Sequence, residues 1–191
     1  LLKSQNEFAE AAGKFSAALE ADPGHLQSAV ELAEIAIIRR REIERGSELL
    51  DKALSEEGKP TMSPDVVGKA LALKAEVLVV QGKLADAVPL FEEALKADKN
   101  NAFTNGRLAH AYAELNQPEK AAPLFQAATK AQPDNLELTE GYLSTLITLG
   151  KMDEATQVMT SANTRFPGSA TLAYLSARVA DKLDNAKEAE E

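Results

Sequence analysis

The sequence predicts an all-α solenoid, built as an array of antiparallel helix pairs, on two observations. Similar residue types return every 34 positions along much of the chain, as from Ala87 to Ala121 to Ala155. Such repetition indicates stacked supersecondary units. Apolar residues make up 45% of the chain but aromatic residues only 5%, so alanine supplies much of the apolar count. Alanine favours closely packed helices over sheets.

The second half of each repeating unit has the spacing of a helical stripe. Ala121, Phe125 and Ala128 are separated by four and then three positions, which places them on one face of a helix. Matching residues stand 34 positions before and 34 positions after these three: Ala87, Phe91 and Ala94, then Ala155, Met159 and Ala162. Pro133 and Pro167, which repeat at the same interval, mark the ends of such helices, because proline cannot continue a helix.

The first half of each unit predicts another helix, since Leu108, Ala109 and Tyr112 share a stripe. Between the two halves stand residues that suit a tight break: Gly82, Asn116 and Gly150. We expect the small residues to let two helix backbones approach closely, while Phe125 fills the space between helix pairs.

The unit from Ala102 to Asn135 resembles the tetratricopeptide repeat, whose family pattern is W-x2-L-G-x2-Y followed by A-x3-F and a terminal P. Its matching residues stand in register with that pattern: Leu108, Ala109, Tyr112, Ala121, Phe125 and Pro133. Asn105 takes the place of the Trp and Ala109 that of the Gly, and neither departure changes the predicted fold. Three consecutive units in phase support the resemblance. It implies a right-handed superhelix whose first helices line the concave wall.

The repeats predict a single array over residues 1–191. We expect a partial repeat that keeps its second helix at 1–24, a divergent repeat with a one-residue insertion at 26–58, an insertion loop at 59–67, repeats at 68–101, 102–135 and 136–169, and a partial repeat at 170–191. The stretch SEEGKPTMSPDVV, with one Gly and two Pro, favours the loop. The chain opens in mid-pattern without a convincing polar cap, so we expect a piece of a longer protein.

Composition narrows the class of partner. The net charge of −9 disfavours broad contact with nucleic acid or anionic lipid, which depends on Lys and Arg. The absence of Cys excludes disulfides and thiolate zinc sites. No apolar run approaches the roughly 20 residues that span a bilayer, so we expect no direct membrane insertion. The alanine-rich composition suggests a bacterial protein, with cytoplasm and periplasm both open.

No motif in the sequence indicates catalysis, a cofactor or a metal ion. His25 and His110 are the two histidines, and neither has a second ligand at a zinc spacing, so we interpret both as surface or groove imidazoles. The GKPT stretch at 58–61 lacks the second Gly and the preceding strand of a phosphate-binding loop. The run Arg39–Arg41 lies near the end of a helical pattern, where cations offset the helix dipole. We expect a protein that is not an enzyme.

The resemblance implies a partner-binding groove on the first helices, formed by positions that packing between helices leaves unused. Apolar side chains interleaved with charges suit a peptide or a helix of a partner protein. The predicted groove residues are Val30, Glu34, Ile37, Ala72, Glu76, Val79, Phe103, Arg107, His110, Glu140, Ser144, Ile147, Tyr174 and Arg178.

Some tetratricopeptide domains hold a C-terminal carboxylate with a clamp of two Lys, two Asn and an Arg. Carried over by register, the resemblance places Ala72 and Glu76 where the first Lys and Asn would stand, and Glu137 where a later Lys would stand. Acidic side chains at these places repel an acidic tail. We therefore expect no binding of chaperone-type tails that end in EEVD.

Three functions fit these observations. The first is a non-enzymatic scaffold or adaptor that binds a protein or peptide partner in the groove. The second is a substrate-recruiting arm of a larger multidomain enzyme, such as a glycosyltransferase or kinase, whose catalytic part lies elsewhere. The third is self-association, with incomplete repeats stacking head to tail.

Overall fold

The computed structural model describes the backbone of residues 2–190 and the side chains of residues 7–39 and 41–183. Over the described backbone the chain folds into helices joined by short turns and contains no strand, which confirms the all-α prediction. The chain divides into two compact units, Leu1–Lys99 and Asn100–Glu191.

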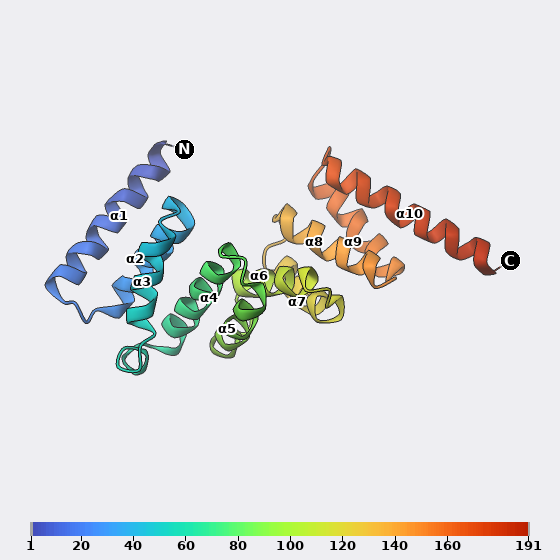
Figure 1. Ribbon diagram of the computed structural model, residues 1–191. Coiled ribbons are helices and arrows are strands. Elements are labelled where there is room, and N and C mark those ends of the chain that lie inside the picture. Colours follow the sequence, from blue (N-terminus) through green and yellow to red (C-terminus); the bar gives the residue numbers. More distant parts are fainter. Residues whose placement is uncertain (1, 191) are drawn as a thin grey trace. The chain divides into compact units, whose positions relative to one another are not determined.

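Unit 1 contains the first half of the helices, and consecutive helices pack side by side (Figure 1). They are α1 (Leu2–Ala21), α2 (Leu26–Glu34), the π-helical turn η1 (Ile35–Arg40), α3 (Ile43–Ala53), the 3-10 turn η2 (Lys59–Thr61), α4 (Pro64–Val80) and α5 (Leu84–Ala97). A π-helical turn is wider than an α-helical one, so η1 takes up an extra residue within the region where the sequence shows a one-residue insertion.

The predicted insertion loop at 59–67 is shorter in the structure than expected. Lys59–Thr61 form the η2 turn, and α4 begins at Pro64, so residues 64–67 are helical. Ser63 has the extended backbone of an N-cap residue, and Pro64 suits the first helical position because its fixed φ matches a helix and it needs no amide hydrogen there. Val66 is buried in the core of unit 1, which anchors this first turn.

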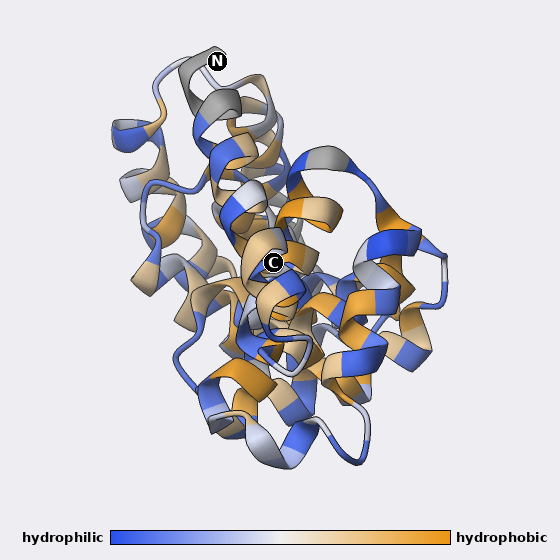
Figure 2. Cartoon of the chain, turned by 90° about the vertical axis from the view of Figure 1, so that its left-hand side faces the viewer, coloured by the Kyte–Doolittle hydropathy of each residue, from blue (hydrophilic) through white to orange (hydrophobic). Residues whose placement is uncertain are grey.

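Unit 2 contains α6 (Ala102–Glu114), α7 (Pro118–Ala131), α8 (Leu136–Thr148), α9 (Met152–Arg165) and α10 (Ala170–Glu190). Each helix packs against its chain neighbour, and α8 also contacts α6 and α10. The helices carry both apolar and polar residues, as Figure 2 shows, and buried apolar residues of each helix supply its contacts with neighbouring helices.

The turn inside each helix pair repeats in atomic detail. A residue at positive φ follows the first helix of the pair, with φ of +75° at Gly82, +56° at Asn116 and +71° at Gly150. The next amide then donates to a carbonyl of the preceding helical turn, as in Lys83 to Leu78 at 2.8 Å, Gln117 to Tyr112 at 2.8 Å and Lys151 to Leu146 at 3.0 Å. This is the Schellman arrangement, which satisfies carbonyls at a helix end and requires a residue that tolerates positive φ.

The residues that recur in sequence are the ones that fill the core. Phe91 and Phe125 are fully buried, as are Ala109, Ala121 and Ala128. The stripe predicted from their spacing therefore packs between helices.

We expect Phe125→Ala to lower the free energy of unfolding by about 3–5 kcal/mol, because the ring is fully buried and its removal leaves a cavity. Urea unfolding followed by circular dichroism measures the change. Phe103→Ala serves as the matched control, since Phe103 is 39% exposed and its loss should cost less than about 1.5 kcal/mol. Equal losses in the two variants would contradict the assignment of Phe125 to the core.

Candidate functional site

The predicted groove residues of unit 2 that remain accessible come from three helices. Phe103, Arg107 and His110 lie on α6, Glu140 and Ser144 on α8, and Tyr174 and Arg178 on α10. Because α6 contacts α8 and α8 contacts α10, these side chains belong to neighbouring helices. All seven are exposed or half-buried. We call this set the first-helix surface of unit 2.

Polar contacts connect the three helices at this surface. The Nε2 atom of His110 on α6 lies 3.8 Å from Oε1 of Glu137 on α8. The hydroxyl of Ser169, at the start of α10, donates to Oε1 of Glu140 on α8 at 3.4 Å. Glu140 thus joins α8 to the start of α10 by a hydrogen bond, whereas Glu137 only lies near His110, beyond hydrogen-bond distance.

His110 is the most constrained side chain of the surface. Its ring meets the ring of Phe125 edge to face, with centroids 4.8 Å apart and an angle of 88° between planes. Its Nε2 atom is buried and has no hydrogen-bond partner among the described residues. Burial lowers the pKa of His110, and the charge of Arg107 lowers it further, while Glu137 opposes both. The imidazole is thus neutral at pH 7 and packs mainly as an apolar ring.

Two aromatic rings of the surface remain open to solvent. Phe103 is 39% exposed and Tyr174 is 64% exposed. The guanidinium carbon of Arg178 lies 5.9 Å from the centre of the Tyr174 ring, which is cation–π distance. Aromatic and Arg side chains dominate the energetic centres of protein interfaces, so these residues are candidates for partner contact.

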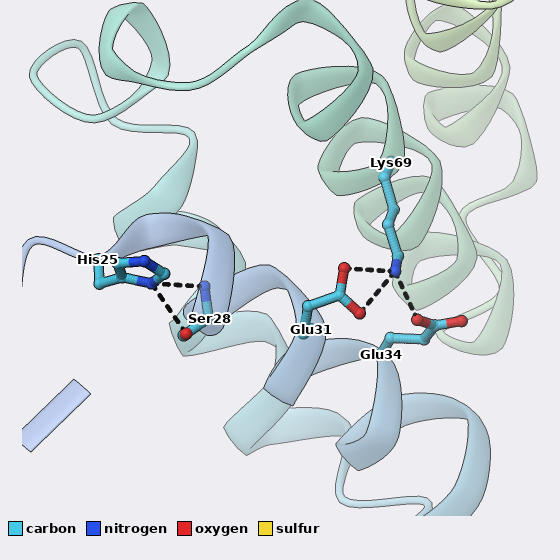
Figure 3. A network of polar contacts seen from close by, with 5 residues as sticks. All are labelled: His25, Ser28, Glu31, Glu34 and Lys69. Atoms are coloured by element: carbon cyan, nitrogen blue, oxygen red, sulfur yellow. Dashed lines mark hydrogen bonds and ion pairs between the residues drawn. The ribbon is translucent and has the colours of Figure 1, made fainter. Parts of the chain in front are cut away.

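In unit 1 the exposed side of α2 and α4 is held by an ion network, drawn in Figure 3. The Nζ atom of Lys69 on α4 lies 2.8 Å from Oε1 of Glu31 and 2.7 Å from Oε2 of Glu34, both on α2. Burial alone would lower the pKa of Lys69, but the two carboxylates outweigh it and raise the pKa. Glu34, a predicted groove residue, is therefore engaged within the unit.

At the start of α2, His25 is the residue that precedes the first helical turn. Its Nδ1 atom accepts from the amide of Ser28 at 3.4 Å and lies 2.8 Å from the Ser28 hydroxyl (Figure 3). The imidazole is thereby an N-cap, which satisfies an amide of the first helical turn.

Five predicted groove residues are buried, so for them the expected exposure is wrong. Val30 and Ile37 belong to the core cluster formed by α2, η1, α3 and α4, and Ala72, Glu76 and Ile147 are at most 9% exposed. A helix in a stacked array is covered on more than one side, which leaves a narrower exposed strip than the predicted groove assumed. Val79, in contrast, is half-buried, and its neighbour Val80 is 59% exposed.

The groove prediction missed two charged residues that shape these surfaces, Lys69 and Glu137. Both occupy the position of Phe103 in their own repeats, Lys69 one repeat before it and Glu137 one repeat after it. Applying the period to every residue chosen in one repeat would have found them.

Within the described residues no three His, Cys, Asp or Glu side chains come close enough together to hold a metal ion. No described helix is both long enough and apolar enough to cross a bilayer.

Comparisons with known families identify the repeat. Two family models, both described as tetratricopeptide repeat, match residues 78–139 and residues 1–61 and 38–102. The second alone covers more than half of the chain. The chain belongs to the tetratricopeptide repeat family.

Solved structures agree with this assignment. The crystal structure of YrrB, described as a tetratricopeptide-repeat protein with an unusual peptide-binding site, is 25% identical, covers 93% of this chain and 92% of its own, and has a TM-score of 0.73. A crystal structure of MamA is 14% identical, with 85% and 91% covered and a TM-score of 0.64. The first tetratricopeptide domain of Spaghetti (RPAP3), bound to the HSP90 peptide SRMEEVD, is 18% identical, with 63% and 95% covered and a TM-score of 0.57. No curated protein matches the chain in sequence.

We expect the stability of the fold to fall as the pH drops below about 6.5, the ordinary pKa of His. Burial lowers the pKa of His110 in the folded chain, so as the pH falls the imidazole of the unfolded chain is protonated first. The stability that the neutral His110 contributes is therefore complete above pH 6.5, and it is lost as the pH falls from 6.5 to the lower pKa of the folded chain. Urea unfolding at pH 7 and pH 5.5 measures the effect.

His110→Gln should lose less stability than the wild type between these pH values, while the control Thr160→Ala, which changes no titratable group at an exposed position, should follow the wild type. A pH dependence that is the same in His110→Gln and the wild type would show that His110 does not contribute to it.

Proposed function

We propose that this chain is a non-enzymatic interaction scaffold, which binds a peptide or a helix of a partner protein on its first helices. The observation that supports the proposal most directly is the first-helix surface of unit 2, where Phe103 and Tyr174 expose aromatic rings on helices that also carry Arg107 and Arg178. Among the described residues, large hydrophobic side chains that are exposed are few, and two of them lie on this surface.

The chemistry of the surface favours a partner with both apolar and charged side chains. Tyr174 and Phe103 offer ring faces to aliphatic or aromatic groups, and Arg178 offers charge to acidic groups. Glu140 and Glu137 of α8 stand among them, and Glu137 is 72% exposed at its side chain. Mixed charge of this kind selects partners by charge pattern rather than by net charge.

The structural relatives support peptide binding as the type of interaction. YrrB is described as having an unusual peptide-binding site, whereas the RPAP3 domain, described as bound to an HSP90 peptide, has the fold alone in common with this chain. The proposed binding positions are the exposed and half-buried predicted residues: Glu34 and Val79 in unit 1, and Phe103, Arg107, His110, Glu140, Ser144, Tyr174 and Arg178 in unit 2. The division into repeats at the predicted boundaries is part of the same proposal.

The recruiting-arm hypothesis makes use of the same surface, so its partner would be a substrate of an enzyme rather than a member of an assembly. The lack of a recognisable catalytic motif in the sequence supports the scaffold as the activity of this chain itself.

We expect Tyr174→Ala and Phe103→Ala each to lower the affinity for a captured protein partner by about thirtyfold, the loss typical of an interface hot spot. Partners would be captured by affinity purification with cross-linking and identified by mass spectrometry, and their affinity then measured by isothermal titration calorimetry with purified chains. Thr160→Ala, an exposed position on α9, is the matched control and should leave the affinity unchanged. Partners that bind the wild type, Tyr174→Ala and Phe103→Ala equally would contradict the proposed surface.

The peptide SRMEEVD provides a test of selectivity. We expect no binding, because Glu76 and Glu137 stand at positions where the family's carboxylate clamp carries an Asn and a Lys. Isothermal titration calorimetry with the synthetic peptide measures the outcome. Micromolar binding would contradict the assignment of those positions.

A further inference from the structure

A cleft lies between the second helices of unit 2, away from the residues of the first-helix surface. Its main hollow, about 390 Å³, is lined by residues of α7 and α9, with Thr139 and Tyr142 of α8 between them. A smaller hollow of about 210 Å³ is also lined by Tyr142, together with residues at the start of α7 such as Glu119 and Ala122. Both hollows are lined by Gln126, Tyr142 and Glu154, so they adjoin, and we call the two together the outer cleft.

A hydrogen-bonded cluster stabilises the middle of the outer cleft. The hydroxyl of Tyr142 donates to Oε1 of Glu154, which joins α8 to α9. The side chain of Gln126 on α7 also hydrogen-bonds Tyr142. Burial, reinforced by Glu154, raises the pKa of Tyr142, so the hydroxyl stays protonated and keeps its role as donor. The cleft therefore has a defined polar floor rather than being a gap between loosely packed helices.

The walls of the main hollow offer hydrogen-bonding groups that the described part of the chain does not use. Gln157 and Ser161 on α9 line the hollow with exposed side chains, and neither has a partner within the described residues. A Gln carboxamide both donates and accepts, so it can pair with the amide and the carbonyl of an extended peptide. Val158 and Phe166, which line the same hollow, are half-buried and offer an apolar seat for a side chain.

Two basic residues line the main hollow. Lys130 and Arg165 stand in the last turns of α7 and α9, and both line the main hollow. Arg165 is engaged by Asp134 at 3.3 Å and by the carbonyl of Pro133 at 2.9 Å, whereas Lys130 has no partner within the described residues. An acidic side chain of a bound segment near the C-terminal ends of α7 and α9 would pair with Lys130.

We propose that the outer cleft is a second peptide-binding site, which takes an extended segment with an aliphatic side chain at Val158 and an acidic side chain towards Lys130. The volume of the main hollow lies within the roughly 300–1,000 Å³ of ordinary ligand pockets. The site uses the second helices, so it is independent of the groove on the first helices.

The test is a selection of random displayed peptides, about a dozen residues long, on the purified full chain. Selected peptides are synthesised, and their affinity is measured by fluorescence anisotropy. We expect a class of peptides that loses at least tenfold in affinity with Val158→Arg, which fills the hollow, and with Gln157→Ala. Phe103→Ala and Thr160→Ala are the controls and should leave that class unaffected. Thermal unfolding of each variant shows that the fold is kept.

A double-mutant cycle tests the direction of binding. When the acidic residue of a selected peptide is replaced by its amide, the affinity for the wild type should fall. The affinity for Lys130→Ala should change little, because that variant lacks the charge with which the acidic residue pairs.

Two results would overturn the proposal. One is a selection in which every peptide depends on Phe103 or Tyr174 and ignores Val158→Arg and Gln157→Ala, which would leave the first-helix groove as the peptide site. The other is a selection that returns no peptide whose binding depends on the cleft residues.

Discussion

The contact of the Phe125 ring with the backbone of α8 is the constraint on which unit 2 depends. Phe125 is fully buried on α7, and a Cβ added to Gly141 on α8 would lie 2.6 Å from its Cε1 atom and 2.7 Å from its Cζ atom. Such distances are well inside van der Waals contact, so α8 can approach α7 this closely only with Gly at this position. The same ring packs against the edge of His110, so one side chain fixes α6, α7 and α8 together.

Close packing on one side of each first helix determines what remains for function. The stripe that contains Ala109 packs against the neighbouring helices, and Glu140 of α8 hydrogen-bonds Ser169 at the start of α10. Phe103 and Tyr174 are left exposed, and Arg178 stays half-buried beside the Tyr174 ring. The second helices leave a different opening, the outer cleft, whose two hollows are both lined by Tyr142 of α8 and its hydrogen-bond partner Glu154 of α9.

The period of the repeat is enough to predict the helix pairs, the buried stripe and the breaks at Gly82, Asn116 and Gly150, because each of these depends on spacing within one repeat. Val30 and Ile37 were misplaced because their burial depends on how α2, η1, α3 and α4 pack together, which a helical pattern in one segment does not contain. The outer cleft was also beyond the sequence. Tyr142 stands where the family pattern has Leu, and the bond of its hydroxyl to Glu154 depends on the distance between two helices.

Comparison of two Gly→Ala variants tests the central claim most directly. Gly13 lies inside α1 with no atom within 4 Å of an added Cβ, so Gly13→Ala should raise the free energy of unfolding by roughly 0.5–1 kcal/mol through helix propensity alone. Gly141→Ala gains the same propensity, but its methyl group collides with the buried Phe125 ring, so the account predicts a net loss of stability in urea unfolding. A gain in Gly141→Ala equal to that in Gly13→Ala would show that the close approach of α8 to Phe125 does not hold the unit together.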